Sequence, residues 1–116
     1  MKKKDKKIAH KIALYMLDKK AKDIKIIKID KISSIADYMI ICSSDSSPQT
    51  KAITNYIKDK LFEEEKIKPW HIEGYENLKW VLIDYVNIIV NIFSNEYRKY
   101  YTIERLWADG DLENIK

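Results

Sequence analysis

The segment DYMIICSSDSSPQT, residues 37–50, constrains the fold more than any other part of the chain. Its near-continuous apolar run from Tyr38 to Cys42 predicts a strand over residues 36–42 that is buried on both faces. Four serines and an aspartate follow, and then Pro48, whose missing N–H does no harm in the first turn of a helix. We therefore expect a strand, a short polar loop and then a helix over about residues 48–65.

The rest of the chain alternates between the two periodicities of secondary structure. Apolar residues at helical spacing predict two further helices, and β-branched or alternating segments predict four further strands. The last two strands are close enough to form an antiparallel hairpin. The expected helices cover residues 5–20 and about 94–107, and the expected strands cover 24–30, 70–74, 80–85 and 88–93.

The length of 116 residues fits one domain with a single core. We expect a single α/β domain over residues 1–107, with a mixed sheet of about five strands flanked by helices, and a frayed C-terminal tail at 108–116. No segment has the apolar length of a membrane span or a secretion signal, so we expect a soluble, cytoplasmic protein. Cys42 is the only cysteine and His10 and His71 are the only histidines, which makes a metal site or a bound cofactor unexpected.

Positive charge gathers at the N-terminus. Residues 1–31 hold twelve lysines against four aspartates, whereas residues 32–116 hold ten basic and fourteen acidic side chains. A basic start of this kind can lie against RNA phosphates. We favour the alternative, a solvated helix face. Arginine, whose guanidinium binds phosphate through two hydrogen bonds, occurs only at Arg98 and Arg105.

The serine loop allows three interpretations. A phosphate cradle needs glycines for close backbone approach, and SSDSSP has none. A nucleophilic serine or Cys42 needs a base within reach, and the two histidines lie in other predicted elements. The third interpretation is a helix cap, in which Ser46 or Ser47 accepts a hydrogen bond from the open N–H groups of the helix, and this is the one we favour. Cys42 is expected to be a buried small apolar residue.

Nucleotidyl transfer is the main catalytic alternative. That chemistry needs at least two carboxylates that converge on magnesium, commonly one residue apart on one strand. The strand over 80–85 offers Asp84 alone, and the Asp-x-Asp at Asp109–Asp111 lies in the predicted tail. We therefore expect no catalytic residues.

The hairpin offers a candidate partner-binding surface. Alternation places Trp80, Asp84 and Asn91 on one face, and this mixture of aromatic and polar groups is unusual for a core. Our hypothesis is that Trp80, with Tyr85 at the hairpin tip, forms a docking surface, because aromatics beside polar groups are typical interface anchors. The alternative is that Trp80 packs under a helix.

Four motifs in order resemble the ribosomal silencing factor family, also called Iojap-like proteins. They are SSIADYMIICSSDSS, EGYENLKWVLIDY, VNIF and E-x-R-x-x-Y-x-I-E-R-L-W, between about residue 8 and Trp107. The resemblance implies a nucleotidyltransferase-like fold without catalysis. It also implies that the chain binds a conserved protein, the fourteenth in the usual series, on the subunit-joining face of the large ribosomal subunit. Steric block of subunit joining would then lower translation when nutrients are scarce.

The resemblance also implies a homodimer in isolation, and the last motif adds Arg98 and Tyr101 to the candidate contacts. The candidate partner-binding residues are thus Trp80, Asp84, Tyr85, Asn91, Arg98 and Tyr101.

The sequence departs from the family pattern at four places. Ser44 stands where the family usually has glycine, Pro48 where it has a basic residue, and Asn91 where it often has histidine. The hairpin turn is Val86-Asn87 instead of Gly-Asp, and valine tolerates a positive φ poorly.

Overall fold

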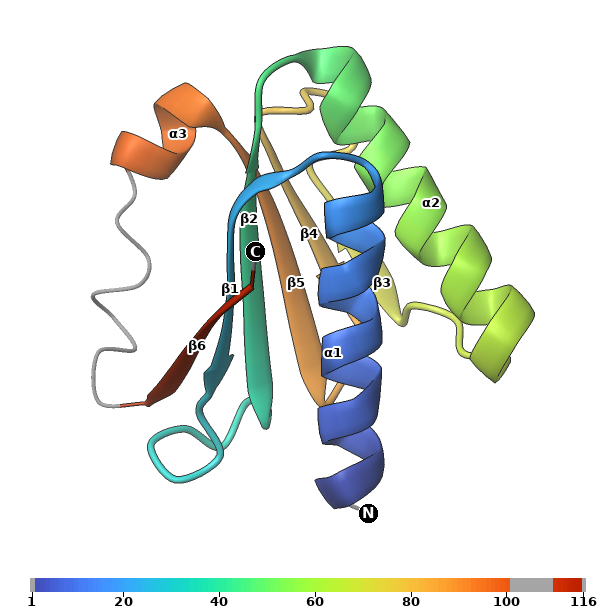
Figure 1. Ribbon diagram of the computed structural model, residues 1–116, viewed down its shortest axis with the longest axis vertical. Helices are drawn as coiled ribbons and strands as arrows, with labels where there is room; N and C mark the ends of the chain where they lie inside the picture. Colours follow the sequence, from blue (N-terminus) through green and yellow to red (C-terminus); the bar gives the residue numbers. More distant parts are fainter. Residues whose placement is uncertain (1, 101–109, 116) are drawn as a thin grey trace.

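The chain forms one six-stranded mixed sheet with two long helices against it (Figure 1). The computed structural model describes residues 2–100 and 110–115. The strand order is β3-β4-β5-β2-β1-β6, in which β2 and β5 run parallel and every other neighbouring pair is antiparallel. This confirms the single α/β domain with a mixed sheet. The elements are α1 (Lys2–Asp18), β1 (Lys22–Lys28), β2 (Tyr38–Ser44), α2 (Ser47–Glu65), β3 (His71–Glu73), β4 (Trp80–Asp84), β5 (Ile88–Ser94), α3 (Asn95–Tyr100) and β6 (Asp111–Ile115).

Helices α1 and α2 cover the same face of the sheet, and Figure 1 shows them side by side in front of the strands. The larger core cluster lies between these helices and the sheet, and a smaller cluster occupies the opposite face. Strand β2 contributes to both clusters, and all seven of its residues are buried, as its apolar run predicted. In the described part of the chain, no helix combines the length and apolar character of a membrane span.

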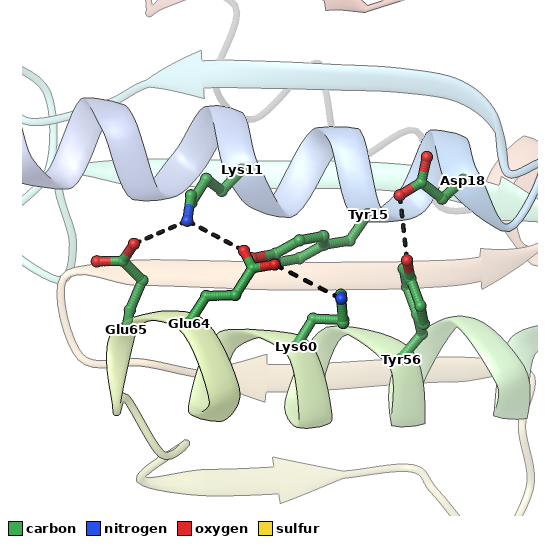
Figure 2. Close-up of polar contacts among 7 residues, drawn as sticks. All are labelled: Lys11, Tyr15, Asp18, Tyr56, Lys60, Glu64 and Glu65. Carbon is green, nitrogen blue, oxygen red and sulfur yellow. Dashed lines mark hydrogen bonds and ion pairs between the residues drawn. The ribbon is translucent and has the colours of Figure 1, made fainter.

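A polar network fastens α2 to α1 (Figure 2). The Lys11 ammonium lies 3.0 Å from a Glu64 carboxylate oxygen and 2.8 Å from one of Glu65. The partly buried Tyr15 hydroxyl donates to Glu64 at 2.5 Å, and Tyr56 donates to Asp18 at 3.2 Å. Hydrogen bonds from Tyr15 and Lys11 lower the pKa of Glu64 to about 2. The two helices are thus joined to each other as well as to the sheet.

The serine loop is a helix cap, as predicted. The Ser46 hydroxyl accepts from the Gln49 backbone N–H at 3.2 Å, and Pro48 lies in the first turn of α2. The Gln49 side chain donates to the carbonyl oxygens of Lys19 and Lys20 at 3.1 and 3.0 Å, which ties the start of α2 to the end of α1. This loop therefore sets the relative position of the two helices.

The C-terminal segment corrects the sequence prediction of a tail at 108–116. Residues Asp111–Ile115 form β6, which pairs antiparallel with β1 from Ile24↔Ile115 to Lys28↔Asp111. Backbone hydrogen bonds extend the open edge of β1, while four of the five β6 side chains are exposed. A strand without a buried face leaves no hydrophobic alternation to detect, which explains both the missed strand and the count of five.

Candidate partner-binding face

Strands β4 and β5 present one face to the helices and the other face away from them. Val81 and Ile83 of β4 belong to the core beneath α1 and α2. The intervening residues of β4 are half-buried, as strand alternation requires for the opposite face. We name this opposite surface the Trp80 face. It consists of Trp80, Leu82 and Asp84 from β4 with Ile89, Asn91 and Phe93 from β5.

Trp80 is held in place by its two neighbours on β5. Its indole Nε1–H donates to the Asn91 side-chain oxygen at 2.9 Å, and its ring stacks on Phe93 with 4.9 Å between centroids. Asn91 is fully buried, and its Nδ2 contacts the Met39 sulfur at 2.7 Å. Because the buried Asn91 amide oxygen accepts the hydrogen bond of the indole N–H, it fixes the orientation of the ring. Trp80 therefore offers a preorganised, half-exposed aromatic surface.

Asp84 shapes the end of the hairpin. Its carboxylate accepts from the Val86 backbone N–H at 2.7 Å, and its carbonyl accepts from the Trp70 N–H at 2.8 Å. Residues 2–100 and 110–115 contain no group of three His, Cys, Asp or Glu side chains positioned to hold a metal ion. The geometry of Asp84 is that of a turn-forming residue.

The other candidate residues have different surroundings. Tyr85 packs against the helix-covered core, and its buried hydroxyl has no hydrogen-bond partner among the described residues. Burial raises the pKa of this hydroxyl. Arg98 of α3 is only 8% exposed and donates to the Ser43 hydroxyl and to the Asp23 carbonyl, each at 2.9 Å. Tyr101 lies outside the described residues.

The structure thus brings Trp80, Asp84 and Asn91 onto one face and turns Tyr85 toward the helix-covered core. Arg98 bonds to Ser43, the strand neighbour of Phe93, and so lies buried on the same side of the sheet as the Trp80 face. Residues Leu82 and Ile89 also reach this face and are half-buried there. Strand alternation is consistent with both positions. The sequence does not single them out, because a leucine and an isoleucine in a strand have the composition of an ordinary core.

Cys42 and Ser44 of β2 lack the surroundings of a nucleophile. Cys42 is fully buried, and burial raises the pKa of its thiol to about 12. Ser44 is bonded to Thr50. His10 bonds to Lys6 and Glu113, and His71 lies 3.7 Å from Glu73, so both imidazoles have other neighbours.

Comparison with known proteins places this fold in one family. The sequence matches the profile of the family described as "Ribosomal silencing factor during starvation" over residues 2–116. It is 38% identical over 98 residues to the ribosomal silencing factor RsfS of Bacillus subtilis, covering 84% of this chain and 82% of that protein. A more distant relative is the mouse "Mitochondrial assembly of ribosomal large subunit protein 1", at 28% identity over 91 residues, which covers 76% of this chain and 40% of that protein.

Solved structures agree with the sequence relatives. A crystal structure of a Chromobacterium violaceum protein superimposes with a TM-score of 0.81 at 35% identity, covering 86% of this chain and 83% of that chain. A Bacillus halodurans crystal structure gives a TM-score of 0.74 at 30% identity over 98% of both chains. The chain therefore belongs to the ribosomal silencing factor family.

Proposed function

We propose that this chain is a non-enzymatic cytoplasmic factor that binds the large ribosomal subunit and keeps the small subunit from joining it. Its docking site is the conserved fourteenth protein on the subunit-joining face, and its effect is lower translation when nutrients are scarce. The observation that carries the proposal is the match to the silencing-factor family over residues 2–116.

The Trp80 face is the proposed contact surface. Trp80 is a rigid aromatic group with Asp84 beside the hairpin turn, and interface anchors typically combine a fixed aromatic with polar neighbours. Leu82 and Ile89 add half-buried apolar area between them. Helices α1 and α2 cover the other side of the sheet, so they do not compete for this surface.

A steric mechanism requires only that the bound protein be thick enough to keep the two ribosomal subunits apart. The described fold measures 34 × 33 × 26 Å along its principal axes. Atoms across a protein interface approach to within about 4 Å, so a body of this thickness on one joining surface prevents contact around it. No chemical step is required, and Asp84 bonds within its own turn.

Sucrose-gradient sedimentation of purified ribosomal subunits with the protein tests this proposal. We expect the protein to sediment with large subunits and to reduce subunit joining without added nucleotide. Magnesium-dependent nucleotide binding that Asp84→Asn abolishes would support the nucleotidyltransferase alternative instead. Full subunit joining at saturating protein would contradict the proposal.

A matched pair of variants tests the surface. Leu82→Arg places a charge on the Trp80 face, and Leu14→Arg places the same charge on α1, where Leu14 is 54% exposed. We expect Leu82→Arg to weaken large-subunit binding at least about tenfold, as for a central interface position, and Leu14→Arg to leave it unchanged. Circular dichroism melting establishes that both variants fold. Equal binding by the two would move the contact away from this face.

A further inference from the structure

A second surface, at the end of α2, combines exposed aromatic rings with lysines. Trp70 is 74% exposed and Phe62 is 43% exposed. Beside them lies a hollow of about 300 Å³ that Lys58, Phe62 and Lys68 line together with Asp59 and Pro69. We name the set Lys58, Phe62, Lys66, Lys68 and Trp70 the Trp70 patch.

The backbone fixes this arrangement. Helix α2 ends at Glu65 and is capped by Lys66, which has the left-handed conformation with φ 58° and ψ 33°. The Lys66 N–H bonds to the Phe62 carbonyl at 3.0 Å. Ile67 then packs against the core while Lys66 and Lys68 on either side of it stay exposed. The Trp70 N–H bonds to the Asp84 carbonyl at 2.8 Å. The connector between α2 and β3 therefore holds its lysines and Trp70 outward at defined positions.

The lysine ammonium groups of the Trp70 patch are not neutralised by ion pairs among the described residues. The Lys66 and Lys68 ammonium groups lie 5.5 and 5.3 Å from the Phe62 ring centroid. Within the described residues, neither of these lysines nor Lys58 forms an ion pair with a carboxylate. Of the nearby carboxylates of α2, Glu64 and Glu65 are bound by Lys11 of α1, whereas Glu63 beside Phe62 is exposed. Asp59 shares the hollow and Glu63 adjoins it, so Lys58, Lys66 and Lys68 outnumber the two acidic groups.

We propose that the Trp70 patch binds single-stranded nucleic acid, with a base stacked on the Trp70 indole and adjacent phosphates bound by Lys66 and Lys68. The Phe62 ring lies 5.5 and 5.3 Å from the Lys66 and Lys68 ammonium groups, and the exposed Trp70 follows Lys68 by two residues. Exposed rings and lysines on one surface suit a single strand, because every base has a stacking face and every nucleotide carries a negative charge. An apolar protein partner would have to remove three ammonium groups from water in order to cover Trp70. This activity goes beyond the proposed ribosome docking and does not depend on it.

Fluorescence anisotropy with a labelled single-stranded oligonucleotide about ten nucleotides long tests the proposal on the isolated full chain. RNA and DNA of one sequence are compared, and the tighter binder identifies the natural strand. We expect Trp70→Ala to weaken binding at least about fivefold, the loss typical of one stacked base. The double variant Lys66→Ala/Lys68→Ala should make the slope of log affinity against log salt shallower by about 1.4, as for two lost phosphate contacts.

The matched control is Lys31→Ala/Lys51→Ala, which removes two exposed lysines outside the patch. Binding close to that of the wild type is expected for this control. An equal loss in the control would overturn the proposal, because it would indicate attraction to net charge alone. Failure of both oligonucleotides to bind, or equally tight binding of a poly-glutamate peptide, would overturn it too. Each of these failures would leave the sedimentation test of ribosome docking unaffected.

Discussion

Asn91 is a polar residue in a fully buried position on the sheet, and its amide links Trp80 to the core. Replacing it with alanine removes the acceptor for the indole N–H and leaves a small cavity beside Met39. We expect Asn91→Ala to lower the free energy of unfolding by about 2 kcal/mol, within the range for a buried hydrogen-bonded group. Urea unfolding followed by circular dichroism measures this change.

Trp80→Phe is the companion variant, because it keeps an aromatic ring for stacking on Phe93 and removes the N–H donor. If the 2.9 Å hydrogen bond stabilises the face, the double variant Asn91→Ala/Trp80→Phe should lower the free energy of unfolding by less than the sum of the two single variants. Strict additivity would contradict that role for the bond.

Val86 carries the strain of the hairpin turn. Its φ is +74°, and the Asn87 N–H bonds back to the Tyr85 carbonyl at 2.9 Å, which is a tight three-residue turn that β-branched residues rarely adopt. Val86→Gly relieves this strain, so we expect the free energy of unfolding to rise by up to about 1 kcal/mol despite the greater chain entropy of glycine. Thermal melting measures it, with Val86→Ala as the control that keeps a Cβ. A stabilisation as large in the alanine variant would show that backbone strain is not the cause.

At the scale of elements, the sequence was informative wherever a side chain had to be buried. The run from Tyr38 to Cys42 predicted a doubly buried strand, and the serines before Pro48 predicted the cap of α2. Strand β6 was missed because backbone pairing holds it and its side chains remain in water. The sequence predicts a strand that begins at Trp70, whereas β3 begins at His71 and the Trp70 side chain is exposed. The local sequence pattern indicates which side chains are buried. The pairing of an edge strand and the exposure of a side chain depend instead on the other elements that pack nearby.

The contact between β6 and α1 includes a titratable bond. His10 faces two acceptors, the Lys6 carbonyl at 2.9 Å and the Glu113 carboxylate at 3.0 Å, and both raise its pKa above the usual value, the Lys6 bond most. The contribution to stability is therefore complete below about pH 6.5, the unfolded value, and is lost as pH rises through the higher folded pKa. We expect the stability difference between wild type and His10→Asn to shrink from pH 6 to pH 9, measured by thermal melting.

Glu113→Gln provides the control on the partner side, since it removes the negative charge and keeps a hydrogen-bond acceptor. The difference in stability between Glu113→Gln and wild type should shrink over the same pH interval. Asp5, whose pKa is raised by burial and by Asp37, is present and unchanged in both variants. A His10→Asn difference that stays constant with pH would mean that the imidazolium does not hold β6 to α1.

At the scale of the whole molecule, the candidate site depends on where the helices pack. Strand alternation predicted that Trp80, Asp84 and Asn91 share a face, and the structure confirms this. The alternation by itself could not say which face α1 and α2 cover, because both faces of β4 and β5 carry apolar residues. The contacts of Gln49 and the network between Lys11 and Glu64 hold the two helices together on one side, and no strand pattern encodes these contacts.

A large group attached to one side of the sheet should therefore affect binding to the large subunit differently from the same group attached to the other side. Cys42 is buried with a raised pKa, so a cysteine introduced at the surface is the reactive thiol in each variant. We expect a polyethylene glycol chain attached through maleimide at Leu82→Cys to abolish sedimentation with large subunits. The same chain at Leu14→Cys of α1 or Lys51→Cys of α2 should leave sedimentation intact, because the helix side faces away from the proposed contact. Loss of binding from tags on the helices alone would assign the contact to the opposite side of the molecule.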